Sequence, residues 1–186
     1  MEMNELFQNG FENVKRVLDR TLDGLTPAEL KWQPRSDANS IGLILFHSIR
    51  SEDHAIHRLQ EKPQLWESEK WYQKFNKKIE DGGAHYTADQ VASFVVPDQR
   101  ELLAYAEAVR KETVNYLKGL KPKDLDKKVN LPPPPAHMVM PSGRPVPKWP
   151  PFDPIVGMML LHEVNHLSEH AGEVSYLRGL QRGMDK

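Results

Sequence analysis

Apolar residues recur every three or four positions along four stretches of this chain. The first such stripe consists of Phe7, Phe11, Val14, Leu18, Leu22 and Leu25. Spacing of this kind is typical of an amphipathic helix that packs on one side. It predicts a long helix over residues 3–24. Comparable patterns predict further long helices over 40–61, 98–119 and 155–179.

Capping residues indicate where several helices begin and end. The segments Thr26–Glu29 and Thr87–Gln90 both place a threonine three residues before a glutamate or glutamine, the pattern of a capping box. They predict short helical turns at both positions. Ser40 or Asn39 can cap the second long helix, and Gly179 is expected to end the last one.

Two connecting segments differ from ordinary loops. Residues 132–154 hold ten of the fifteen prolines, which excludes helix interiors and disfavours central strands. We therefore expect a long proline-rich crossover loop before the last helix, lying against the bundle because it also contains Met138, Met140, Trp149 and Phe152. Residues 64–86 are expected to form a short helix and a loop over the bundle mouth.

Four long amphipathic helices without an alternating strand pattern indicate an all-α fold, a four-helix bundle. A length of 186 residues is that of one domain, so we expect residues 1–186 to fold as a single unit.

Charge and hydropathy exclude two kinds of partner. The chain has 25 Lys and Arg against 26 Asp and Glu, which argues against nucleic-acid binding through bulk charge. The longest apolar run, Ile155–Leu161, is far shorter than the roughly 18 residues of a membrane span. The N-terminal residues 1–10 lack a basic flank and an apolar core, so we expect a cytoplasmic location without a membrane partner.

Cysteine is absent from the chain. This excludes disulfides, thiolate metal sites and cysteine nucleophiles. Any metal must therefore be bound through nitrogen and oxygen, and thiol chemistry would require a thiol cosubstrate.

The histidines carry the strongest chemical signal. His166 and His170 are four residues apart, so both imidazoles can point at one place, although a hydrogen-bonded pair in the core has the same spacing. His47 lies within the apolar stretch 41–49, where an unpaired imidazole would cost on the order of 1–3 kcal/mol. Together the three predict a histidine metal site between two helices, with open positions for water or a substrate.

Several nearby residues are candidates for a supporting role. Carboxylates that can orient ligand imidazoles or accept a proton are Glu52, Asp53, Glu163 and Glu173. We favour Asp53 and Glu173 as the catalytic pair, because a solvated charged face explains Glu163 better than it explains Asp53. His162 can be a fourth ligand, but a surface or capping role is favoured. His54 is expected to be an ordinary surface histidine.

The chain also resembles a known family. The residues that carry the resemblance are Trp32-x-Pro34, Asn39–Gly42, His47 with Arg50 and Glu52-Asp53, Asn165–Glu173 and Tyr176–Leu180. They are similar to the DinB superfamily, particularly its DinB/YfiT-like metalloenzymes. The resemblance implies an up-up-down-down bundle, often a homodimer, that binds a divalent metal through His47, His166 and His170. Zinc or nickel is favoured, and manganese or iron are alternatives.

Characterised relatives in that family include bacillithiol or glutathione S-transferases and a mycothiol-dependent maleylpyruvate isomerase. The resemblance therefore implies a metal-dependent transferase or hydrolase acting on a small electrophilic substrate. The reaction would be thiol transfer with a low-molecular-weight thiol cosubstrate, or hydrolysis by metal-bound hydroxide. The alternatives are a non-catalytic, stress-related bundle protein that binds a metal or ligand, and a dimerisation module without a metal.

Overall fold

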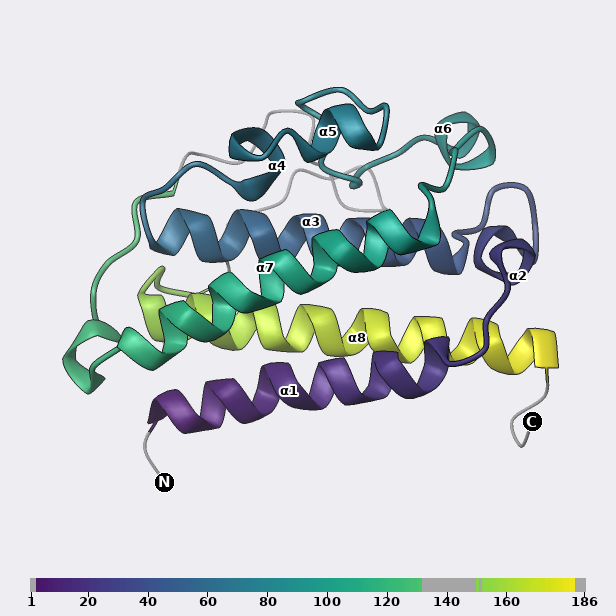
Figure 1. Ribbon diagram of the computed structural model, residues 1–186. Coiled ribbons are helices and arrows are strands. Elements are labelled where there is room, and N and C mark those ends of the chain that lie inside the picture. The colour runs from purple at the N-terminus through teal and green to yellow at the C-terminus, as the bar shows by residue number, and fades with distance from the viewer. Residues whose placement is uncertain (1–2, 132–149, 151, 183–186) are drawn as a thin grey trace.

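The computed structural model describes residues 3–131, 150 and 152–182. Its four long helices are α1 (Met3–Leu22), α3 (Ile41–Leu59), α7 (Gln99–Gly119) and α8 (Val156–Arg182) (Figure 1). Between them lie the short helices α2 (Pro27–Lys31), α4 (Leu65–Ser68), α5 (Trp71–Lys74) and α6 (Ala88–Ala92), and the 3₁₀ turn η1 (Pro122–Asp124). The described residues contain no β-strand beyond one isolated bridge between Lys128 and Ile155. The predicted all-α fold is confirmed.

The long helices form a ring in which α1 and α3 each pack against both α7 and α8. Helices α1 and α8 run in one direction, and α3 and α7 run in the other (Figure 1). Along the chain the directions are therefore up, down, down and up. Around the ring, in the order α8, α1, α7 and α3, the directions are up, up, down and down, which is the predicted order.

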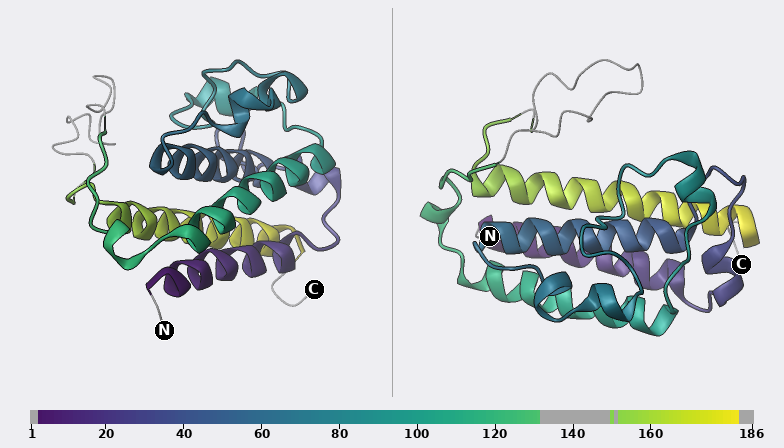
Figure 2. Two further views of the ribbon diagram at one scale, coloured as in Figure 1. Left: turned by 60° about the vertical axis from the view of Figure 1, so that its left-hand side comes forward. Right: turned by 90° about the horizontal axis from the view of Figure 1, so that it is seen from above.

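The connection that runs the length of the bundle is the segment 60–98, because it joins the parallel helices α3 and α7. It carries α4, α5 and α6; α4 and α5 lie over α3 and α7 as an additional layer, in contact with Phe46 of α3 and Tyr105 of α7 (Figure 2). By contrast, α7 ends and α8 begins at the same end of the bundle. The proline-rich segment that we expected to cross over thus joins two neighbouring ends, and residues 132–149 of it lie outside the described part.

The predicted helix starts are confirmed in atomic detail. The side chain of Thr26 accepts from the backbone of Glu29, whose carboxylate accepts in return from the backbone of Thr26. An equivalent capping box opens α6. Ser40, rather than Asn39, caps α3 by accepting from the backbone N–H of Leu43 at 3.1 Å.

The predicted end of the last helix at Gly179 is wrong, since α8 continues to Arg182. Its last turn is held by contacts with α2: Gln181 donates to the Glu29 carbonyl at 3.0 Å, and Arg182 binds the Glu29 carboxylate at 2.5 Å. These tertiary contacts outweigh the cost of about 1 kcal/mol for a glycine inside a helix.

Two apolar clusters make the core. One, which includes Phe46, Trp66 and Tyr105, joins the crossover segment to α3 and α7. The other, which includes Phe11 and Leu160, joins α1, α7 and α8. Helix α3 is buried on most sides, which agrees with its apolar first half. No helix in the described ranges is both long and apolar enough to cross a membrane.

Candidate metal centre

Three histidines from two helices meet where α3 packs against α8. The Nε2 atom of His166 lies 3.2 Å from Nε2 of His47 and 3.0 Å from Nε2 of His170. One ligand nitrogen from each of the three can be chosen so that all lie within 4.8 Å of one another. The structure thus brings together the three residues that the sequence singled out, because His166 and His170 occupy successive turns of α8 opposite His47 on α3.

The outer nitrogens of the two α8 histidines are bound by groups that fix their tautomers. Nδ1 of His170 lies 2.7 Å from Oε2 of Glu173, a carboxylate oxygen that can only accept. Nδ1 of His166 lies 3.1 Å from Oγ of Ser51, and this hydroxyl donates to Oε2 of Glu163 at 3.2 Å. Both imidazoles therefore carry their proton on Nδ1 and turn the Nε2 lone pair towards the shared point.

Two inward lone pairs at 3.0 Å repel each other unless a proton or a cation lies between them. With metal–nitrogen bonds of about 2.0–2.1 Å and tetrahedral angles, ligand nitrogens lie about 3.3 Å apart. The observed 3.0 and 3.2 Å are close to this value. All three histidines are only partly buried. The residues present fit a divalent cation with open coordination positions.

The lowered pKa of His47 agrees with a ligand role. Burial, together with the neighbouring imidazoles of His170 and His166, lowers the pKa of His47 to about 4, so this ring is neutral at pH 7. The Glu163 carboxylate, whose Oε1 lies 3.9 Å from Nδ1 of His166, raises the pKa of His166, so a bound cation would have to displace a proton from this ring. Nδ1 of His47 is buried without a hydrogen-bond partner in the described part of the chain.

Known proteins resemble this chain in sequence profile and in fold. The sequence profile described as the DinB superfamily matches residues 11–172, a range that includes all three histidines. The chain belongs to the DinB superfamily. A crystal structure of a conserved protein from Enterococcus faecalis has the same fold, with a TM-score of 0.77, 23% sequence identity and 97% of each chain covered. No curated protein matches the chain.

In this DinB-superfamily protein Glu173 lies where the sequence placed it, next to His170. The sequence missed Ser51 and ranked Glu163 below Asp53, whereas the structure puts Ser51 and Glu163 at the cluster. The signal was present: Ser51 follows His47 by four residues and Glu163 precedes His166 by three, so each lies on the same side of its helix as the histidine.

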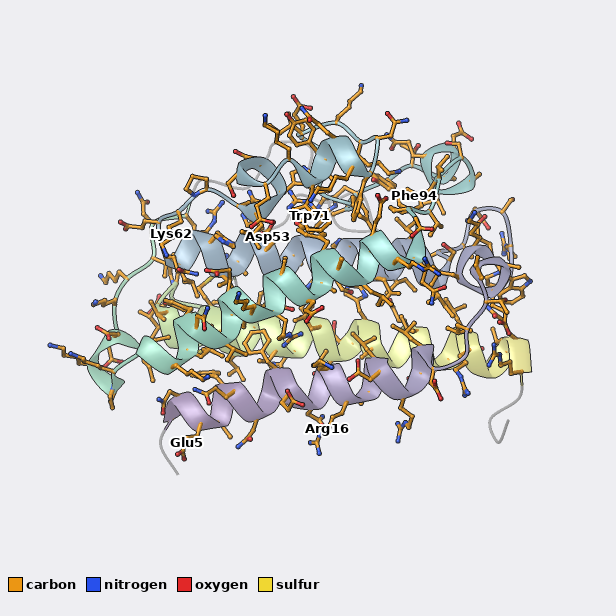
Figure 3. The ribbon with its side chains drawn as sticks, viewed as in Figure 1. Glu5, Arg16, Asp53, Lys62, Trp71 and Phe94 are labelled. Atoms are coloured by element: carbon orange, nitrogen blue, oxygen red, sulfur yellow. The ribbon has the colours of Figure 1, made fainter. Side chains whose placement is uncertain are left out.

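Asp53 does not belong to the cluster, and its contacts do not support the predicted catalytic role. Its fully buried carboxylate accepts from the backbone N–H groups of Leu65 at 3.0 Å and Trp66 at 2.9 Å, and from Tyr105 Oη at 2.5 Å. Figure 3 shows Asp53 on the side of α3 that faces α4. Six residues after His47, it lies about 120° away around the helix. Asp53 anchors the crossover segment to α3.

Two cations complete this buried network. His57 Nδ1 lies 2.7 Å and Arg50 Nη1 3.3 Å from the Asp53 carboxylate. Burial opposes ionisation of Asp53, but hydrogen bonds from His57 and Tyr105 hold its pKa below the usual value. Burial likewise opposes the charge on His57, yet the bond to Asp53 raises its pKa. Asp53 and His57 therefore form a buried ion pair beneath the crossover.

The remaining candidates lie at the edge of the cluster or outside it. The ring of His162 stacks on that of His166, with centroids 6.3 Å apart and an angle of 11° between the planes. Its atoms are not among those that converge on the shared point. Glu52 is buried against α7, where Thr113 donates to it at 2.6 Å.

Proposed function

We propose that this protein is a metal-dependent enzyme, which binds a divalent cation, zinc or nickel, through His47, His166 and His170. Its substrate is a small electrophile, and the reaction is thiol transfer or hydrolysis. One observation carries the proposal: two Nε2 lone pairs, fixed by hydrogen bonds on the far side of each ring, face each other at 3.0 Å.

The surrounding side chains have defined tasks in this proposal. Glu173 and the Ser51–Glu163 pair hold the rings of the α8 histidines in the orientation that a ligand requires. Glu173, with 54% of its side chain exposed, can also exchange a proton between Nδ1 of His170 and solvent. A divalent cation bound to the three imidazoles supplies Lewis-acid activation of water or a thiol at neutral pH.

Both candidate reactions need a substrate to reach the three ligands, and the partial exposure of the histidines is consistent with such access. In thiol transfer the thiol must come from a diffusible cosubstrate, because the chain has no cysteine. The homodimer, the cytoplasmic location and the absence of nucleic-acid and membrane partners remain predictions.

The test is the metal content and activity of single variants. The purified protein should carry about one zinc or nickel ion per chain by elemental analysis, and His47→Ala, His166→Ala and His170→Ala should each lose most of it. His162→Gln, which changes a stacked imidazole outside the convergent set, should keep it. Unchanged metal content in all three alanine variants would exclude the assigned site.

Activity separates an enzyme from a non-catalytic metal-binding protein. The metal-loaded protein should accelerate the reaction of glutathione with an activated aryl halide or the hydrolysis of an activated ester, and a chelator should abolish the acceleration. A metal-loaded protein that accelerates neither reaction across a panel of thiols and esters would favour the non-catalytic alternative.

A further inference from the structure

The histidine side of α3 continues beyond the metal centre. His47, Ser51, His54 and Arg58 follow one another at spacings of four, three and four residues, so they lie along one face of the helix. The first two contact His166 on α8. The last two therefore lie further along the same side of the helix, towards its C-terminal end.

An open hollow of about 340 Å³ lies at that end. Its walls include His54, Arg58 and Lys62 from α3 and the residues that follow it, together with Gln64 and Glu67 from the start of the crossover. Figure 3 labels Lys62 at this end of α3. The hollow thus begins where the face that carries His47 and Ser51 ends.

The two cations of the hollow are held by neutral groups. Nε and Nη2 of Arg58 donate to Nε2 of His54 at 3.2 and 2.8 Å, and Nζ of Lys62 donates to Gln60 at 2.8 Å. Burial and the charge of Arg58 lower the pKa of His54, which agrees with a neutral acceptor ring. Within the described residues neither cation has a carboxylate partner, and Glu67 is the one acidic residue lining the hollow.

We propose that this hollow binds the carboxylate group of the substrate or thiol cosubstrate whose reacting atom lies at the histidine cluster. Arg58 and Lys62 against Glu67 leave the hollow with a net positive charge. Because His54 already orients Arg58, the remaining N–H groups of Arg58 are available to a carboxylate. This inference rests on the proposed function, since it names the class of ligand that the metal centre takes.

The separation of the two places limits the length of that ligand. The guanidinium of Arg58 contacts His54, which is seven residues from His47, a rise of about 10 Å along the helix. The reacting atom and the carboxylate are then about 10 Å apart. A peptide-sized thiol or an elongated carboxylate-bearing electrophile fits this distance, and a two-carbon thiol does not.

The first experiment tests the hollow without any metal. Metal-free, ¹⁵N-labelled protein is titrated with glutarate, and the side-chain Nε–H signal of Arg58 and the amide of Gln64 should shift with millimolar affinity. Arg58→Gln and Lys62→Gln should each weaken binding about tenfold, as for one charge-assisted bond. Glu67→Gln should strengthen it. Absent shifts, or changes of the same sign in all three variants, would overturn the proposal.

The second experiment tests the link to the metal centre. Cobalt-loaded protein is titrated with glutathione and with mercaptoethanol, following the absorption of the cobalt–thiolate bond. Glutathione should bind at least tenfold more tightly, and Arg58→Gln should remove that preference without changing mercaptoethanol binding. A preference that persists in Arg58→Gln would refute the link. If the protein takes up no cobalt, the metal centre is refuted instead. The glutarate titration then still shows whether the hollow binds a carboxylate.

Discussion

Nε2 of His47 and Nε2 of His166 lie 3.2 Å apart, although 119 positions separate the two residues in the chain. The contact exists only because α3 and α8 pack side by side in one register. A shift of either helix by one residue would rotate its histidines by about 100°, away from the other helix. The candidate metal centre therefore depends directly on the packing of these two helices.

The Ser51–Glu163 pair should control how tightly the metal binds. Replacing Ser51 by alanine, or Glu163 by glutamine, removes the group that orients the ring of His166, and either change should weaken metal binding about 10- to 100-fold. The affinity is measured by competition with a coloured chelator. Ser48→Ala is the matched control, since this hydroxyl binds the Ile44 carbonyl instead. Equal affinities of Ser51→Ala and Ser48→Ala would contradict the assignment.

Asp53 should affect stability rather than metal content. Asp53→Asn leaves Arg50 and His57 buried without their counter-charge, so the free energy of unfolding should fall by about 3–5 kcal/mol in urea denaturation. The folded variant should still bind one metal ion. Asp37→Asn breaks an exposed pair with Arg35 and should cost less than about 1 kcal/mol. If the Asp53→Asn variant lost its metal ion but kept its full stability, Asp53 would belong to the metal site after all.

Gly42 should be intolerant of any side chain. A Cβ atom there would lie 2.3 Å from Cγ1 of Val96 and 3.1 Å from the carbonyl oxygen of Leu30. Gly42→Ala should therefore destabilise the protein by about 1–3 kcal/mol through overpacking. Gly172→Ala has open space around the new methyl group and should stabilise α8 by about 0.5–1 kcal/mol. Thermal unfolding of both variants checks the opposite signs.

The ion pair between Glu29 of α2 and Arg182 at the end of α8 should make the stability of the protein depend on pH. Hydrogen bonds from Arg182 and Thr26 lower the pKa of Glu29 to about 2, below its ordinary value of 4.5. The folded state therefore binds fewer protons than the unfolded chain in this range, and the stabilisation present above about pH 4.5 is lost as the pH falls towards 2. Urea unfolding at several pH values measures this loss.

Two variants isolate the contribution of this Glu29–Arg182 ion pair. Glu29→Gln cannot ionise, and Arg182→Gln removes the main cause of the lowered pKa. Both should show a smaller loss of stability between pH 6 and pH 3 than the unaltered protein does. If Glu29→Gln keeps the full pH dependence, the lowered pKa of Glu29 is not its source.

Local features of the sequence predicted the helices because the interactions that set them lie within a turn or two. Thr26 and Glu29 bind each other across three residues, and the apolar stripe of α1 repeats within its own length. The end of α8 could not be predicted in this way. Gly179 is a weak helix former, and the distant contacts of Gln181 and Arg182 with Glu29 hold the helix past it.

The sequence by itself determined which imidazoles are available and that His166 and His170 share one side of a helix, since helical geometry follows from spacing alone. Only the tertiary structure decided that His47 joins them, that Ser51 and Glu163 orient the ring of His166, and that Asp53 binds the crossover instead. The direction in which a side chain meets a distant segment depends on how whole helices pack. That packing is settled by apolar contacts over the entire bundle, which no local spacing specifies.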